Sequence, residues 1–245
     1  MNLSGKVALV TGGAKRIGRA TALELARRGC DVAIHYHTSR ADAEQTAADI
    51  RALGRRAMLL GANLADPTAA RALPGQVAAE LGRLDVLINN ASMFEEMSLE
   101  SFTVEHWNCT LAVNLTAPMV LSHAAFPLLR ASRAGRIVNL SDISAERPWT
   151  SHLGYCVSKA ALSCLTVALA SAMAPDVYVN AVALGVALFP DDYSEARKKE
   201  VIRNIPALRP GTIEEVAATI CFLVDGSDYI TGAVLACDGG RSLAW

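Results

Sequence analysis

Thr11-Gly12-Gly13-Ala14-Lys15-Arg16-Ile17-Gly18 is a glycine-rich turn between an apolar run and a helix-forming segment. The run Val7–Val10 predicts a buried strand, and the apolar spacing over residues 17–28 predicts a helix. A strand, such a turn and a helix form the first half of a nucleotide-binding βαβ unit. Gly12 lets the backbone approach a pyrophosphate, and the N–H groups at the helix N-terminus favour an anion. An ordinary strand-to-helix turn is the alternative.

The end of the second predicted strand, Asp31–Tyr36, distinguishes between nucleotide cofactors. A chain that binds NAD places Asp or Glu about 20 residues after the glycine turn, where the carboxylate holds ribose hydroxyls. Here that region is occupied by His37, Thr38, Ser39 and Arg40, and Arg16 can reach it from the turn. Hydroxyls and cations suit a 2′-phosphate, so the segment favours NADPH over NADH. Ser39 also fits the N-cap of the next helix.

Composition and charge limit the classes of protein and partner. The 245 residues suit a single α/β domain over 1–245, and a hydrophobic content of 52% is enough for a sheet buried on both faces. The formal net charge is -1 at pH 7. Nucleic acid or an anionic membrane surface would call for a basic excess, so we expect neither as a partner.

The cysteines and the apolar runs predict a cytoplasmic protein. The six cysteines form no C-x-x-C pair, which indicates reduced core residues rather than a metal site or a disulfide framework. The first residues lack the features of a signal peptide. The longest uncharged run, 160–175, is too short and too polar for a membrane span.

The remaining segments alternate between strands and helices, which is typical of a doubly wound parallel sheet. Besides the two strands above, we expect strands at 57–60, 84–88, 136–142, 177–182 and 233–237. We expect further helices at 41–53, 67–81, 104–129, 155–174, 193–204 and 213–223. The excursion over 185–211 is long enough to form a substrate lid.

Several polar residues follow the predicted strands, and each has a structural alternative. Asn63 and Leu64 can border an adenine or cap the next helix. Asn90 can form a wall beside a cofactor or satisfy nearby backbone groups. The Phe94 ring can stack against a flat ligand or pack against other side chains of the protein. Asn114, in the middle of a long helix, indicates a local kink with a water near an active site, or a bond to its own helix.

Asp142, Tyr155 and Lys159 are candidate active-site residues. Asp142 ends the fifth strand, where open α/β sheets place ligands. Tyr155 and Lys159 are four residues apart, so a helix presents both on one face. A nearby ammonium would favour the phenolate and lower the pKa of the tyrosine, and it can also bond a nicotinamide ribose. A surface Tyr–Lys pair is the alternative.

In their order and spacing, these motifs resemble the short-chain dehydrogenase/reductase family over essentially the whole chain. The motifs are Thr11 to Gly18, Asn89-Asn90-Ala91, Asn114, Tyr155-x-x-x-Lys159 and Asp238-Gly239-Gly240. The resemblance implies a seven-stranded parallel Rossmann sheet with helices on both faces. It also implies a homotetramer whose subunits meet through the helices around 104–129 and 155–174.

One departure points to a subfamily. The position normally held by the family's catalytic serine is Asp142, and Ser141 stands one place earlier. Together with Arg16, the His-Tyr-His at the second strand end and Phe94, this aspartate is similar to the pteridine reductases. That resemblance implies NADPH-dependent reduction of a dihydropterin or dihydrofolate, with the pterin sandwiched between Phe94 and the nicotinamide. Arg16 would bond the pterin and a cofactor phosphate, and Asp142 with Tyr155 would supply the proton.

The resemblance also assigns supporting roles and contacts. Lys159 would tune Tyr155, and Asn114 would support Lys159 through water. No metal is implied. The cofactor contacts implied are Gly12, Arg16, Ile17, His37, Thr38, Ser39, Asn63, Leu64, Asn90, Ala91, Ser92, Tyr155, Lys159 and Gly185. The substrate contacts implied are Arg16, Ser92, Phe94, Asp142 and Tyr155.

Two other functions remain open from the sequence. The first is a carbonyl reductase of the same family, such as a 3-oxoacyl reductase, with Ser141 as the proton donor. The second is an NADPH-binding regulatory protein without useful catalysis. An intact pair of Tyr155 and Lys159 argues against the second.

Overall fold

A seven-stranded parallel sheet forms the centre of the molecule in the computed structural model, which describes residues 1–189 and 193–243. The strand order is β3-β2-β1-β4-β5-β6-β7, and every neighbouring pair is parallel. The predicted doubly wound Rossmann fold is therefore confirmed. The strands are β1 (Val7–Val10), β2 (Asp31–Tyr36), β3 (Ala57–Gly61), β4 (Val86–Asn89), β5 (Gly135–Asp142), β6 (Val177–Leu184) and β7 (Val234–Cys237).

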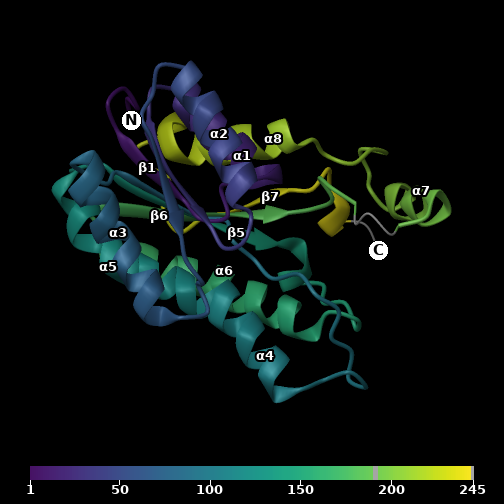
Figure 1. Cartoon of the computed structure of the whole chain (residues 1–245). Coiled ribbons are helices and arrows are strands. Elements are labelled where there is room, and N and C mark those ends of the chain that lie inside the picture. The colour runs from purple at the N-terminus through teal and green to yellow at the C-terminus, as the bar shows by residue number, and fades with distance from the viewer. Residues whose placement is uncertain (190–192, 244–245) are drawn as a thin grey trace.

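Helices cover both faces of this sheet (Figure 1). One layer contains α1 (Arg16–Arg27), α2 (Arg40–Ala52) and α8 (Ile213–Cys221). The opposite layer contains α3 (Pro67–Leu81), α5 (Ala117–Ala131) and α6 (Leu153–Met173). Alternate residues of β1 belong to the two cores: Ala8 and Val10 face the first layer, and Leu9 faces the second. Burial on both faces explains why these strands are continuously apolar.

The long helix predicted over 104–129 is helical throughout, but a π-helical turn interrupts it. Regular helix runs through α4 (Val104–Leu111), gives way to the π turn Ala112–Thr116, and resumes in α5. Asn114 lies inside the π turn. The regular helix is therefore interrupted at the residue for which the sequence indicates a kink.

Two helical runs are long and apolar enough to cross a membrane by length and composition alone. They are Val104–Ala131 and Leu153–Met173, and 44% of the apolar window of the second is buried in the structure. A core helix of a globular protein passes the same test. The sequence expectation considered only the uncharged run 160–175, whereas the second helix starts earlier and includes Lys159.

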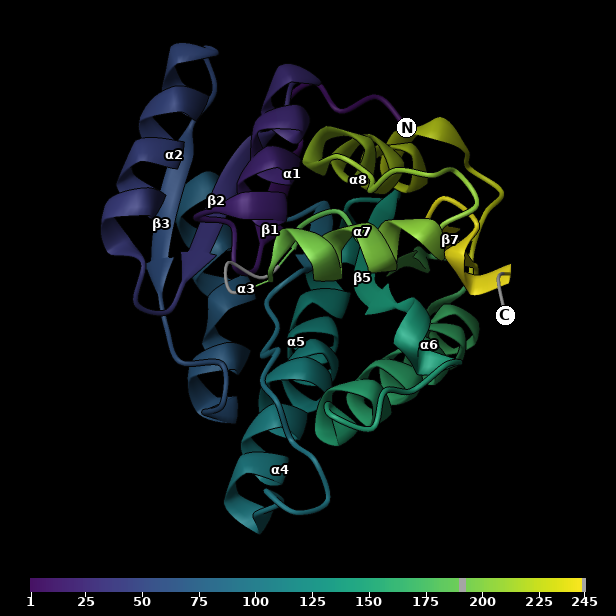
Figure 2. The ribbon, with the colours of Figure 1, turned by 90° about the vertical axis from the view of Figure 1, so that its right-hand side faces the viewer.

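The excursion over 185–211 carries α7 (Glu195–Arg203), which confirms the predicted short helix there. Residues 190–192 of this expected segment lie outside the described residues. Helix α7 lies across the carboxyl edge of the sheet, between the layer with α8 and the layer with α5 and α6 (Figure 2). The backbone N–H of Ala207 donates to Gly239 O at 3.0 Å, which ties the excursion to the C-terminal turn.

Candidate active site at the carboxyl edge of the sheet

A cavity of about 710 Å³ opens at the carboxyl ends of β5 and β6. Its volume is in the range of small-molecule sites, and its position is where open α/β sheets bind ligands. Predicted site residues that line it are Arg16, Ile17, Phe94, Asp142, Tyr155 and Gly185. Residues from both sides of the sheet and from the excursion therefore meet at one site.

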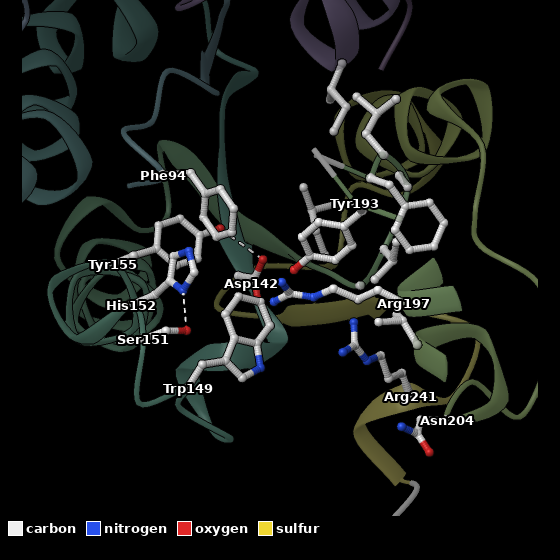
Figure 3. A pocket seen from close by; sticks show the side chains of 18 of the residues that line it. Phe94, Asp142, Trp149, Ser151, His152, Tyr155, Tyr193, Arg197, Asn204 and Arg241 are labelled. Carbon is white, nitrogen blue, oxygen red and sulfur yellow. Dashed lines mark hydrogen bonds between the residues drawn. The ribbon is translucent and has the colours of Figure 1, made fainter. Parts of the chain in front are cut away.

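Asp142 and Tyr155 form a buried hydrogen-bonded pair in this cavity (Figure 3). The Tyr155 hydroxyl donates to Oδ2 of Asp142 at 2.9 Å. The other carboxyl oxygen accepts from the Ser144 backbone N–H at 2.8 Å, so the carboxyl group has a fixed orientation. Asp142 is the last residue of β5 and Tyr155 lies in the first turn of α6, so the fold brings the two together, as predicted.

Burial makes both members of this pair hold protons more tightly. It raises the pKa of Asp142 above its usual value, although hydrogen bonds from Ser144 and Tyr155 oppose the shift. It also raises the pKa of Tyr155 well above its usual value, and the neighbouring Asp142 carboxyl raises it further because it disfavours the phenolate. At neutral pH, Tyr155 is therefore a protonated donor.

The prediction that Lys159 lowers the pKa of Tyr155 is wrong for this structure. The Lys159 ammonium lies 5.4 Å from the centre of the Tyr155 ring, and it donates to Leu140 O at 2.7 Å. Helical spacing puts both residues on one face, but the ammonium is directed to the strand rather than to the phenol oxygen. Burial lowers the pKa of Lys159 to about 8.

Ser141, the alternative proton donor, lies on the other side of β5 from the cavity. Its hydroxyl hydrogen-bonds Ser163 Oγ at 2.7 Å and Lys159 O at 3.1 Å, and the residue is buried. Successive strand residues point to opposite faces, so Asp142 enters the cavity while Ser141 packs against α6. This arrangement favours Asp142 over Ser141 as the group that contacts a substrate.

Asn114 connects the segment after β4 to α6. Its Oδ1 accepts from the Met93 N–H at 2.7 Å and from Ser92 Oγ at 3.2 Å. Its Nδ2 donates to Met93 O at 2.9 Å and to Ser158 Oγ at 3.0 Å. The side chain therefore holds the loop that carries Phe94 beside the helix of Lys159. A water link from Asn114 to Lys159 stays a prediction.

The glycine turn, which we call the cradle, packs too closely for side chains at Gly12 and Gly18. A Cβ on Gly18 would lie 2.1 Å from Gly12 O, and one on Gly12 would lie 3.0 Å from Asn90 Nδ2. Helix α1 begins after Lys15 without a side-chain cap, and its first turn contains no acidic residue. Its N–H groups and dipole therefore favour an anion. Arg16 adopts φ 52 at this turn.

Side chains from neighbouring strands hold the cradle in shape. Asn90 Nδ2 donates to Thr11 O at 2.7 Å and Gly12 O at 3.1 Å, while the backbone N–H of Ala91 donates to Thr11 Oγ1 at 3.0 Å. The backbone-satisfying role of Asn90 is thus present. His35, which the sequence analysis names only as part of the His-Tyr-His at the second strand end, accepts the Gly12 N–H at its Nδ1, 3.2 Å away.

His35 connects the glycine turn to Ala62, the residue that follows β3. With Nδ1 accepting from Gly12, Nε2 carries the proton and is 3.1 Å from Ala62 O. Burial lowers the pKa of His35 to about 4, so the ring is neutral at neutral pH. Strand alternation could have indicated the residue, because His35 is an inward-facing polar group at the carboxyl end of β2.

The expected 2′-phosphate residues follow β2 directly, outside the 710 Å³ cavity. His37 and Thr38 are exposed, and Ser39 is the N-cap residue of α2 without a side-chain cap bond. Asn63 Oδ1 accepts from the Ala65 N–H at 3.0 Å, and Leu64 packs in the core. Their contacts with a cofactor remain predictions.

Aromatic side chains surround Phe94, and they alter the expected sandwich. His152 stacks on the Phe94 ring with a centroid distance of 4.6 Å and an interplanar angle of 17°. Tyr155 and Trp149 contact the ring edge-on, at 4.8 and 6.2 Å. The protein's own His152 therefore covers one ring face, while 45% of the residue stays exposed. A flat ligand has the remaining surface available.

A backbone bridge explains how Phe94 reaches Tyr155. The Met97 N–H donates to Ser151 O at 2.8 Å, and the Leu153 N–H donates to Met97 O at 3.0 Å. Trp149, His152, Tyr193, Arg197 and Arg241 line the cavity as well, and the sequence analysis missed them. The single available signal was the position of His152, one helical turn before Tyr155.

Comparison with known proteins identifies the family of this chain. The family model described as enoyl-(acyl carrier protein) reductase matches residues 12–242. The chain is 34% identical over 239 residues to a 3-oxoacyl-[acyl-carrier-protein] reductase, FabG, of Staphylococcus aureus (strain Mu50), covering 96% of this chain and 97% of that protein. The chain belongs to the short-chain dehydrogenase/reductase family.

Two solved structures are similar over nearly the whole chain. One is a short-chain dehydrogenase from Burkholderia cenocepacia J2315 in complex with NADP, with 38% identity, a TM-score of 0.92, and coverage of 98% and 99% of the two chains. The other is FolM alternative dihydrofolate reductase 1 from Brucella canis complexed with NADP, with 32% identity, a TM-score of 0.93, and coverage of 100% and 96%.

Proposed function

We propose that this chain is an NADPH-dependent reductase that transfers hydride to a C=N bond of a pterin, in a dihydropteridine or dihydrofolate. The observation that carries the proposal is the Asp142–Tyr155 hydrogen bond inside the cavity, at the position where a serine is usual in the family. The Brucella FolM relative supports a substrate of this class.

The assigned cofactor is NADPH, which supplies the hydride when bound. The cradle at Gly12 and Gly18 receives its pyrophosphate, and His37, Thr38 and Ser39 provide donors for its 2′-phosphate without a competing carboxylate. The NADP in the Burkholderia and Brucella complexes supports this assignment.

Asp142 and Tyr155 divide the proton chemistry between them. The phenol of Tyr155 is protonated at neutral pH because burial and the carboxyl raise its pKa, so it can donate to a ring nitrogen. The Asp142 carboxyl accepts hydrogen bonds from the amino groups of a pterin, and its own raised pKa lets it carry a replacement proton. A carbonyl substrate has no amino group that would use this carboxyl.

The rest of the site orients and shields the substrate. Phe94 offers its exposed surface to the flat ring, and Arg16 lines the same cavity near the glycine turn. Ser92 and Asn114 fix the loop that carries Phe94. Lys159, held by Leu140 O, lies where its ammonium can turn to a ribose hydroxyl.

A carbonyl reductase acting on 3-oxoacyl substrates is the second candidate. The Staphylococcus relative and the matching family model favour it. The buried Ser141 hydroxyl, bonded to Ser163 and Lys159 O, weighs against the version in which Ser141 donates the proton.

A substrate panel followed at the NADPH absorbance band tests both candidates. Turnover of dihydrobiopterin, dihydromonapterin or dihydrofolate supports the pterin reductase, whereas turnover of an acetoacetyl thioester alone supports the carbonyl reductase. NADPH binding without turnover of either class, unchanged in Tyr155→Phe, would indicate the regulatory protein. Ser141→Ala serves as the matched control for Asp142→Ala, and we expect only the aspartate change to stop turnover.

We also propose a homotetramer that buries the apolar helices. Met119 on α5 and Val157 and Val167 on α6 are exposed in the single chain, with 39%, 46% and 52% of their surfaces accessible. Apolar side chains along two neighbouring helices are typical of a subunit contact. Light scattering of the purified protein measures the mass of the assembly.

A further inference from the structure

The side of the cavity opposite Phe94 carries two arginines. Arg197 belongs to α7, and Arg241 belongs to the short 3-10 helix Arg241–Leu243. Both line the cavity, and Figure 3 shows both guanidinium groups directed into it, across from the aromatic groups of Phe94, Tyr155 and Trp149. The proposed reduction, which takes place at Tyr155, gives these two cations no role.

Neither guanidinium is neutralised by a carboxylate within residues 1–189 and 193–243. Other arginines are paired: Arg209 binds Glu215 through two bonds of 2.9 and 2.6 Å, and Arg28 binds Asp225. Arg197 instead stacks over the Tyr193 ring, with its guanidinium carbon 4.1 Å from the ring centre. A stacked guanidinium keeps its N–H donors available at the ring edge.

Side-chain oxygens accept backbone hydrogen bonds in the two segments that carry the arginines. Ser194 Oγ accepts the backbone N–H of Arg197 at 3.3 Å and caps α7. Asp238 accepts the backbone N–H groups of Gly240 at 2.9 Å and Ser242 at 2.6 Å, which fixes the turn that carries Arg241. These bonds therefore fix the backbone from which both arginines extend.

The charge of the lining favours an anion. Among residues 1–189 and 193–243, three arginines line the cavity together with two acids, Asp142 and Glu200. Asp142 is already bonded to Tyr155 and the Ser144 backbone, which leaves Glu200 as the other acid of the described lining. Planar guanidinium groups match the oxygens of carboxylates and phosphates.

We propose that Arg197 and Arg241 form a subsite for an anionic group on the substrate, a carboxylate or a phosphate carried on a tail away from the reacting ring. This inference rests on the proposed pterin reduction and narrows its substrate class. Folate-like pterins with a glutamate tail, or phosphorylated pterins, bind more tightly than pterins with an uncharged tail.

Equilibrium binding to the enzyme saturated with NADP⁺ tests this without turnover. Folate, neopterin monophosphate and uncharged biopterin are titrated into wild type, Arg197→Gln, Arg241→Gln and the double variant. Arg203→Gln is the matched control, because Arg203 is exposed on the same helix and does not line the cavity. Each cavity variant is expected to weaken the preferred anionic ligand about tenfold and biopterin less than about twofold.

The pattern across ligands separates the outcomes. Loss of folate binding identifies a carboxylate as the anion, and loss of neopterin monophosphate binding identifies a phosphate. An equal loss for biopterin, a loss no larger than in Arg203→Gln, or a matching loss of NADPH affinity overturns the subsite.

A wild-type protein that binds none of the three pterins contradicts the proposed function instead. The subsite is then tested with acetoacetyl thioesters of coenzyme A, which carries phosphates, and of uncharged N-acetylcysteamine. A larger rise in KM for the coenzyme A ester in the double variant supports the anion subsite, and equal changes overturn it.

Discussion

Replacing Asp142 by asparagine removes the charge of the carboxyl group and keeps its size. The Tyr155 hydroxyl loses a buried carboxylate acceptor at 2.9 Å, while the Ser144 N–H can still donate to the amide oxygen. A buried hydrogen bond to a charged group contributes about 1.5–3 kcal/mol, and a general acid contributes about 10²–10⁴ in rate. We expect kcat/KM for a dihydropterin to fall by about 10²-fold or more, which corresponds to about 3 kcal/mol.

The same substitution has a spectroscopic consequence. The Asp142 carboxyl is one of the groups that raise the pKa of Tyr155, so its neutralisation lowers that pKa. Absorbance titration of the phenolate, with Tyr155→Phe as the subtraction, measures the change. Ser141→Ala is the kinetic control. The reasoning is refuted if Asp142→Asn keeps pterin turnover within about threefold while Ser141→Ala loses it, or if the titration of Tyr155 does not move.

Three further substitutions, the first with a matched control, test residues that support the site. Gly18→Ala places a Cβ 2.1 Å from Gly12 O and should weaken NADPH binding and lower the melting temperature, whereas Gly75→Ala, with open space around it, should stabilise by about 0.5–1 kcal/mol. The pKa of His35 is about 4 in the folded state and about 6.5 in the unfolded state, so the unfolded state takes up the proton first as the pH falls. The free energy of unfolding should therefore drop by about 3 kcal/mol between pH 6.5 and pH 4. In urea titrations, His35→Ala should remove most of this pH dependence. Burial lowers the pKa of the Lys159 ammonium to about 8, so Lys159→Met should raise the free energy of unfolding at pH 7 by about 2–3 kcal/mol. This gain should disappear as the pH rises from 8 through 10.5, because the wild-type folded state then loses the buried charge. If urea titrations show the same gain for Lys159→Met across that pH range, the lowered pKa assigned to the buried Lys159 ammonium is contradicted.

Local sequence patterns were sufficient for the fold. The apolar strands, the glycine turn and the helix spacing depend on periodicity and backbone sterics, which a short stretch of sequence carries. The place of Asp142 at a strand end predicted its position at the ligand edge of the sheet, and the resemblance to the pteridine reductases correctly paired it with Tyr155.

The pKa shift of Tyr155 and the positions of His152 and Arg197 in the cavity could not be predicted from local sequence patterns. The sign of the Tyr155 pKa shift depends on the direction of the Lys159 ammonium and on burial, and both come from tertiary packing. The stack of His152 on Phe94 requires the bridge between Met97 and the segment before α6. Arg197 reaches the cavity because α7 folds back over the sheet edge, a placement that its helical pattern does not encode.

The ratio of kcat/KM for a dihydropterin to kcat/KM for an acetoacetyl thioester, measured with NADPH on the wild-type protein, tests the central claim most directly. The Asp142–Tyr155 pair facing the cavity predicts a ratio well above one. A protein that oxidises NADPH with the thioester and leaves every dihydropterin and dihydrofolate unreduced would contradict the account.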